Sequence, residues 1–172
     1  MHVDGTEKKW VILSFLMAFA MMGILAAYAI NYNIRPPSNV ETIDSNALHL
    51  TEEFGEDNLG LKVKQDGSVV VTMVAARYGF YPQNMKVPSD TPITFRIASA
   101  DVLHGVHTAG TNMNTMVVPG YISELTTTFP HVGKFPMFCN EYCGLGHDYM
   151  WSRLIVVPKD QFKLPAPQGG AQ

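Results

Sequence analysis

The chain has 172 residues, a formal net charge of −3 and an apolar fraction of 47%. This length allows one domain of ordinary size plus an attachment. The slightly negative charge argues against nucleic-acid binding, which favours a basic surface. The near-average apolar fraction hides two unlike regions, an apolar N-terminal segment and a mildly acidic remainder.

The first predicted element is a helix over residues 10–30, WVILSFLMAFAMMGILAAYAI, which contains no charged residue. At about 1.5 Å rise per residue, it covers the roughly 30 Å hydrocarbon core of a bilayer. Trp10 lies at one end, and Tyr28 and Tyr32 lie at the other, as is typical of membrane interfaces. A buried helix of a soluble protein should show a polar face, so we predict a transmembrane helix.

A cleaved signal peptide is the alternative, because Lys8 and Lys9 precede the apolar run and Ala27-Tyr28-Ala29 resembles a cleavage site. The run is longer than a usual signal-peptide core, which favours an uncleaved anchor. Two lysines before the helix against the lone Arg35 after it place the N-terminus inside. We therefore expect a single-pass protein of the plasma (inner) membrane, with a cytoplasmic N-terminus and its main domain on the periplasmic or extracellular side.

Prolines and a change in composition divide the chain. Arg35-Pro36-Pro37-Ser38 should end the helix, because proline lacks the N–H that would continue it. The expected segments are an N-terminal segment with the helix (1–37), a linker (38–64), a β domain (65–160) and a flexible tail (161–172).

The region after residue 65 shows short β-like runs separated by turn signals such as Asp66-Gly67 and Pro119-Gly120. In the run 93–98 the apolar residues alternate, which places every second side chain on one face. Strands are predicted at 68–76, 93–98, 115–119, 124–129, 135–139 and 152–158. Several short strands at this spacing predict an all-β sandwich or Greek-key barrel.

The two cysteines of the chain lie in one short stretch, CNEYCGLGHDYM, between two predicted strands. Cys139, Cys143, His147 and Met150 follow the spacing C-x-x-x-C-x-x-x-H-x-x-M. Thiolate, imidazole and thioether are soft ligands, and the thioether favours copper over zinc. A blue-copper site uses one cysteine, so the second thiolate indicates that two sulfur atoms bridge two metal ions, each completed by a histidine.

A second histidine must then come from elsewhere, and the spacing leaves His104 and His107 as alternatives. His49 and His131 are interpreted as solvated surface residues. A Cys139–Cys143 disulfide is the alternative for the cysteines, but it would close a short loop with little stabilisation and would leave the histidine and methionine unexplained. A zinc site would leave the methionine idle.

The loop closely resembles the binuclear copper (CuA) signature of subunit II of haem-copper terminal oxidases. The matching residues are Cys139, Glu141, Cys143, Gly144, His147 and Met150, and Asp101-Val102-Leu103-His104 resembles the upstream segment of that family. The single membrane segment and the stretch 104–114 are most like the B-type form. The resemblance implies a cupredoxin-like fold for the β domain.

The resemblance also implies roles for these residues. Cys139 and Cys143 bridge two coppers, and His104 and His147 each bind one of them. Met150 and the backbone carbonyl of Glu141 are weak ligands, and His107 is not a ligand. In two-helix relatives the side chain of the matching glutamate helps to hold magnesium at the interface with subunit I, which makes Glu141 a candidate for the same role. Asp101 is expected to support the site through hydrogen bonds.

The function implied is electron transfer within a cytochrome c oxidase. The chain accepts electrons from cytochrome c or a small copper protein and passes them to haem in subunit I, where oxygen is reduced to water. The alternatives are the CuA subunit of a nitric oxide reductase complex and a membrane-anchored copper-handling module. The chain itself shows no general acid, base or nucleophile for substrate chemistry.

An apolar surface near the metal is expected to receive the electron donor. Its candidate residues flank the ligands and are Val106, Tyr142, Leu145 and Tyr149. Phe80 and Tyr81 are interpreted as core and strand-edge aromatics.

Overall fold

The computed structural model describes residues 4–31, 41–163 and 165, and its contacts divide the chain into two units, residues 1–35 and 36–172. The first unit contains one described helix, α1 (Gly5–Asn31), which extends the predicted span at both ends. It is long and apolar enough to cross a membrane, and none of its described side chains is buried. Tyr32, the predicted helix end at 35–38 and most of the predicted tail lie outside the described residues.

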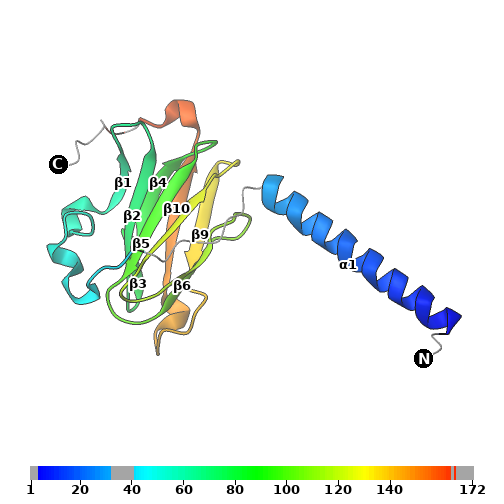
Figure 1. Ribbon diagram of the computed structural model, residues 1–172. Helices are drawn as coiled ribbons and strands as arrows, with labels where there is room; N and C mark the ends of the chain where they lie inside the picture. Colours follow the sequence, from blue (N-terminus) through cyan, green and yellow to red (C-terminus); the bar gives the residue numbers. More distant parts are fainter. Residues whose placement is uncertain (1–3, 32–40, 164, 166–172) are drawn as a thin grey trace. The chain divides into compact units, whose positions relative to one another are not determined.

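The second unit is a sandwich of two sheets with five strands each in its described part (Figure 1). The first sheet contains β1 (Gly60–Val63), β2 (Val69–Ala76), β3 (Gly79–Tyr81), β5 (Ile93–Ser99) and β8 (Ile122–Thr127). The second contains β4 (Asn84–Pro88), β6 (His104–His107), β7 (Asn114–Val117), β9 (Gly133–Phe138) and β10 (Trp151–Val157). The described residues of this unit also form short 3₁₀ helices, which are η1 (Ser45–Leu50), η2 (Glu56–Asn58), η3 (His147–Tyr149) and η4 (Lys159–Gln161).

The strand order shows how the chain crosses between the sheets. It runs β1-β2-β5-β8 in the first sheet, with β3 beside β2, and β4-β10-β9-β6-β7 in the second. The pairs β2–β5 and β4–β10 are parallel, and the other pairs are antiparallel. Neighbouring strands are therefore often distant in sequence. The prediction of an all-β, cupredoxin-like sandwich with one N-terminal apolar helix is confirmed.

The core lies between the two sheets and follows the period of two of a strand. Ile93, Phe95 and Ile97 are fully buried, as the alternation of β5 predicts. They pack in one cluster with apolar side chains of the second sheet, among them Leu154 of β10. All six predicted strands are present within a few residues, whereas the sequence reasoning missed β1, β3, β4 and β6.

The segment 41–58 covers the outer face of the first sheet. Leu48 and Phe54 form a second buried cluster with Ala98 and Ile122 of the sheet. This cover explains why β2 reads VVVTMVAA without polar alternation, since both of its faces are largely buried.

Arg96 fastens this segment to the sheet. Its side chain is 12% exposed and pairs with Glu53 and Glu41 of the segment and with Glu124 of β8. Hydrogen bonds, first of all to Glu53, outweigh burial and raise the pKa of Arg96. The guanidinium therefore stays charged, and one partly buried cation joins three carboxylates from separate parts of the chain.

Candidate metal centre

The loop at residues 139–150 connects β9 to β10 at one end of the sandwich (Figure 1). These two strands pair up to Phe138 and Trp151, so both ends of the loop are held by the sheet. The N–H of Cys139 donates to the carbonyl of Met150 at 3.1 Å and closes the base of the loop. His104 is the first residue of β6, which pairs with β9. The fold therefore brings the loop and the upstream histidine together.

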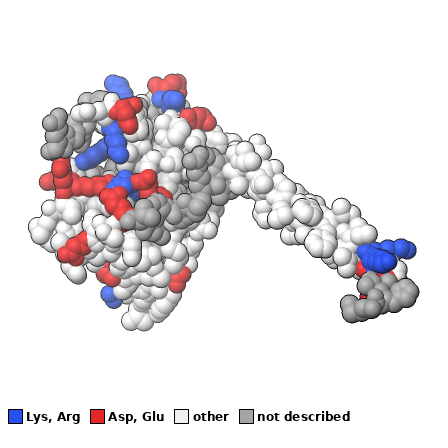
Figure 2. All heavy atoms as spheres, viewed as in Figure 1, with Lys and Arg blue, Asp and Glu red and all other residues white. Residues whose placement is uncertain are grey.

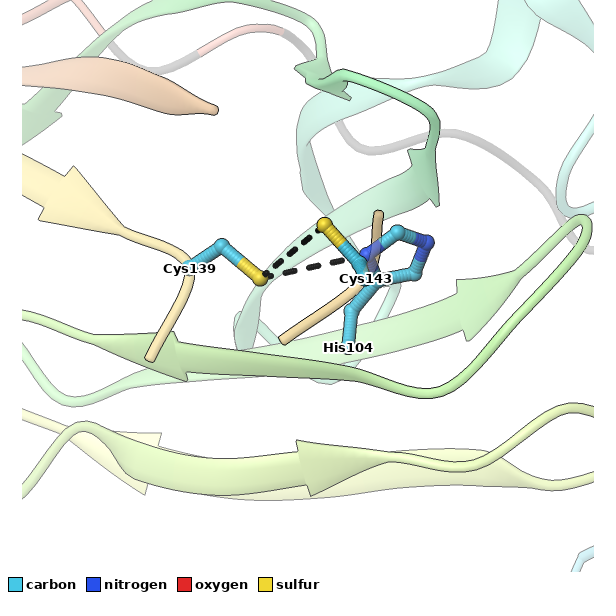
Figure 3. Close-up of side chains that lie close together, drawn as sticks. All are labelled: His104, Cys139 and Cys143. Carbon is cyan, nitrogen blue, oxygen red and sulfur yellow. Dashed lines mark hydrogen bonds between the residues drawn. The ribbon is translucent and has the colours of Figure 1, made fainter. Parts of the chain in front are cut away.

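The sulfur of Cys139 has two neighbours besides the second cysteine. His104 Nδ1 lies 3.9 Å from Cys139 Sγ, and the carbonyl oxygen of Glu141 lies 3.1 Å from it. His104 is fully buried, and Cys139 is buried as well. Figure 3 shows the imidazole and the two thiols converging from β6 and the loop. His104, Cys139 and Cys143 place their donor atoms within 4.8 Å of one another.

The sulfur of Cys143 has a matching pair of neighbours. His147 Nδ1 lies 3.6 Å from it, and Met150 Sδ lies 3.5 Å from it. Met150 is buried in the core cluster, whereas the 3₁₀ turn that begins at His147 leaves this imidazole half-buried. Each sulfur thus has one imidazole and one weaker donor beside it.

The distance between the sulfurs tests whether the site fits a metal. Cys139 Sγ and Cys143 Sγ are 3.9 Å apart and both thiols are free, whereas a disulfide bond is about 2.05 Å long. A metal–thiolate bond is about 2.3 Å long, so both sulfurs can reach the same ion lying between them. The soft, buried donor set therefore fits copper.

The two thiols differ in acidity. Burial opposes ionisation of Cys139, but hydrogen bonds from His104 and the backbone N–H of Gly105 outweigh it and lower the pKa of the Cys139 thiol. Burial and the charge of Cys139 raise the pKa of the Cys143 thiol. Both thiols could therefore ionise together only with a cation between them, and a metal ion would supply that charge.

Asp101 orients His104. Asp101 Oδ1 accepts a hydrogen bond from His104 Nε2 at 2.8 Å, which leaves Nδ1 free to face the sulfur atoms. Asp101 Oδ2 accepts from the backbone N–H of Arg77 at 2.9 Å and from its Nε at 3.2 Å. Burial raises the pKa of Asp101, but the bonds from His104 and Arg77 outweigh it and lower the pKa. No sequence motif points to Arg77 as a supporting residue.

Asn140 is a second residue that the sequence reasoning missed. It donates from Nδ2 to Asn114 Oδ1 at 3.1 Å, which links the loop to β7. A side chain at Gly105, next to His104, would collide with Asn140 Oδ1. The glycine therefore lets the loop approach the histidine strand closely.

Three other described histidines are not among the donors grouped with the cysteines. The buried Nδ1 of His107 has no hydrogen-bond partner among the described residues. His49 and His131 are exposed.

The expected apolar surface is present at the loop. Tyr142, Leu145 and Tyr149 are exposed, with Leu145 94% accessible, whereas Val106 is buried. Phe80 is buried in the core, and Tyr81 is half exposed. Figure 2 shows few charged atoms at the end of the domain that carries this loop.

Comparison with known proteins supplies the family context. The sequence profile of the family "Cytochrome C oxidase subunit II, periplasmic domain" matches residues 61–158. A cytochrome c oxidase subunit 2 of Thermus thermophilus is 30% identical over 152 residues, which cover 87% of this chain and 90% of that relative. A second T. thermophilus protein of that name is 32% identical over 121 residues, which cover 70% of this chain and 90% of that relative. A chain from a cryo-EM structure of a heme-copper terminal oxidase dimer shares the fold, with a TM-score of 0.70 and 24% identity. The match covers 88% of this chain and 99% of that one.

Proposed function

Because this chain belongs to the cytochrome c oxidase subunit II family, we propose that it carries electrons into a terminal oxidase through a binuclear copper (CuA) centre. Subunit II is part of a haem-copper oxidase complex that also contains subunit I. The apolar helix α1 and the periplasmic domain family fit a membrane-anchored subunit. Lys8 and Lys9 at the start of α1 support a cytoplasmic N-terminus and a periplasmic β domain.

The main support for the proposal is that each of the two sulfur atoms has its own set of neighbouring donor atoms. Each thiolate lies between the other thiolate and an imidazole, and each side has one further weak donor. A site for one metal ion would not need this duplication. The residues that would hold the copper are His104, Cys139, Glu141, Cys143, His147 and Met150.

Bound copper would supply a one-electron redox couple. The chain contributes by holding the donors still: the sheet fixes both ends of the loop, and Asp101 fixes the ring of His104. Burial of His104 and Met150 excludes water from the inner side of the site. Ligands that move little between oxidation states favour rapid electron transfer, since little reorganisation is then required.

The partners follow from this role. We propose that cytochrome c or a small copper protein gives the electron and that haem in subunit I receives it, with oxygen reduced to water in subunit I. A magnesium ion held by the carboxylate of Glu141 at the interface with subunit I also stays a prediction.

Copper uptake tests the donor set. The reduced full chain in detergent should bind two copper ions per chain and become coloured, with His107→Ala as a matched control that retains both ions. Binding of a single ion would overturn the proposal. So would a chain in which Cys139 and Cys143 form a disulfide and which takes up no copper after that bond has been reduced.

Replacing Asp101 with alanine should weaken copper binding about 10–100-fold, the usual range for residues that orient a ligating histidine. The ring of His104 would lose the acceptor that holds its Nε2–H. Competition with a copper chelator measures the change. Asp101→Asn keeps an oxygen acceptor and should lose less, so equal losses in the two variants would contradict the role of this hydrogen bond.

Replacing Leu145 with aspartate should raise the KM for the electron donor about ten-fold, because it puts a charge into the centre of an apolar docking surface. The kcat at saturating donor should stay near the wild-type value. Leu50 is an equally apolar, exposed residue on η1, and Leu50→Asp is the matched control. An unchanged KM for Leu145→Asp would place the donor elsewhere.

A further inference from the structure

The ring of Tyr78 lies directly on the backbone of the metal-binding loop. Tyr78 is in the turn between β2 and β3, and it is 39% exposed. A Cβ atom at Gly146 would lie 2.5 Å from Tyr78 Cδ2 and 2.7 Å from its Cγ. A Cβ atom at Gly144 would lie 2.7 Å from the Tyr78 hydroxyl oxygen. The aromatic ring therefore occupies the space that side chains at these two positions would fill.

The two glycines are required for different reasons. Gly144 has a φ of +131°, which L side chains rarely adopt, so its backbone alone requires glycine. Gly146 has a φ of −98°, which other residues adopt readily. Close packing against Tyr78 is thus the structural reason for glycine at residue 146.

The same backbone carries the ligands. Gly144 directly follows Cys143, and its carbonyl accepts the N–H of His147 at 3.1 Å. The carbonyl of Gly146 accepts the N–H of Tyr149 at 3.1 Å and so builds the turn that contains His147. A shift of either glycine would move Cys143 and His147 relative to each other.

We propose that Tyr78 is a positioning residue for the metal centre: its ring is the surface on which residues 143–147 fold, and it sets the spacing of Cys143 Sγ and His147 Nδ1 before copper binds. This inference rests on the proposed copper function. It gives the β2–β3 turn a role in the centre, although that turn supplies no ligand.

The first test compares Tyr78→Ala with Tyr78→Phe in the full chain. Removal of the ring should speed copper release to a chelator about 10-fold or more, in line with other residues that support ligands. It should also alter the visible spectrum. Phenylalanine keeps the ring atoms that contact Gly146, so Tyr78→Phe should keep the wild-type rate of copper release and the wild-type spectrum. Thermal unfolding of each variant separates loss of the centre from loss of the fold.

The second test uses the glycines. Gly146→Ala should disturb copper binding when Tyr78 is present and should be tolerated in the Tyr78→Ala background, where the colliding ring is gone. Gly144→Ala is the matched control: it should be harmful in both backgrounds, because its backbone conformation disfavours alanine.

The outcomes separate this inference from the proposed function. If the wild-type chain took up no copper, the proposed function would fail and this inference with it. If the wild-type chain bound two ions and Tyr78→Ala released them at the wild-type rate, only the inference would fail. Equal harm from Gly146→Ala in both backgrounds would also overturn it.

Discussion

Replacing Cys143 with serine is expected to reduce the rate of electron transfer from the donor to the haem of subunit I by more than about 100-fold. Cys143 Sγ lies beside three other donor atoms, those of Cys139, His147 and Met150, so its loss removes the centre of the set. Changes to residues that only support ligands cost about 10–100-fold, and in the proposed centre Cys143 bridges the two copper ions, so its loss should exceed that range. Stopped-flow reduction of the assembled complex measures the rate.

Two comparisons show that the effect is chemical rather than structural. Serine is close to cysteine in size but its hydroxyl is costlier to bury, so Cys143→Ser should lower the free energy of unfolding of the copper-free chain by no more than about 1–3 kcal/mol and leave it folded. Met150→Leu keeps the volume of a buried side chain and removes only the thioether, so it should retain both copper ions with an altered spectrum. A Cys143→Ser complex that transferred electrons at the wild-type rate would rule out a bridging role for this residue.

Replacing Phe129 with alanine is expected to lower the free energy of unfolding of the β domain by about 3–5 kcal/mol. Phe129 is fully buried, and its ring lies 6.3 Å from that of Phe95 and 5.8 Å from that of Phe135. Alanine would leave a cavity between the two sheets that these neighbours can fill only in part. Urea unfolding of the full chain, followed by fluorescence, measures the loss.

Phe138 provides the control for this prediction. It lies in β9 and is 44% exposed, so Phe138→Ala should cost less than about 1 kcal/mol. Equal losses at the two positions would show that the core between the sheets does not dominate the stability of the domain.

Strands with a strong apolar pattern were predictable from the sequence, and those formed by pairing alone were not. The runs 69–76 and 93–99 are rich in β-branched residues, and the prediction is correct there within a residue. β6 reads His-Gly-Val-His and has no such enrichment, so the sequence predicts no strand there. It is a strand because it pairs with β7 and β9, which lie later in the chain.

The two histidines of β6 show the same limit at the metal centre. Spacing alone left His104 and His107 as alternatives for the second imidazole. Residues three apart in a strand point to opposite faces, and of these two histidines only His104 is grouped with the cysteines in the structure. Once β6 is known to be a strand, its pleat places His104 and His107 on opposite faces, which distinguishes the candidate ligand from the other histidine.

The residues that support the ligands could not be predicted from the sequence, for a different reason. The glycines at 144 and 146 indicate that another group packs closely against the loop, but the sequence pattern does not show which residue this is. Tyr78 lies more than sixty residues earlier in the chain than Gly144 and reaches it only through the fold. Arg77 reaches Asp101 in the same way, because the adjacent parallel strands β2 and β5 end side by side.

Electron paramagnetic resonance of the copper-loaded full chain in detergent tests the central claim most directly. A bridged site predicts that one unpaired electron is shared equally by two copper nuclei, so that the hyperfine splitting arises from both nuclei and disappears in Cys143→Ser. A spectrum with splitting from a single copper nucleus, at one bound ion per chain, would contradict a binuclear electron-transfer centre.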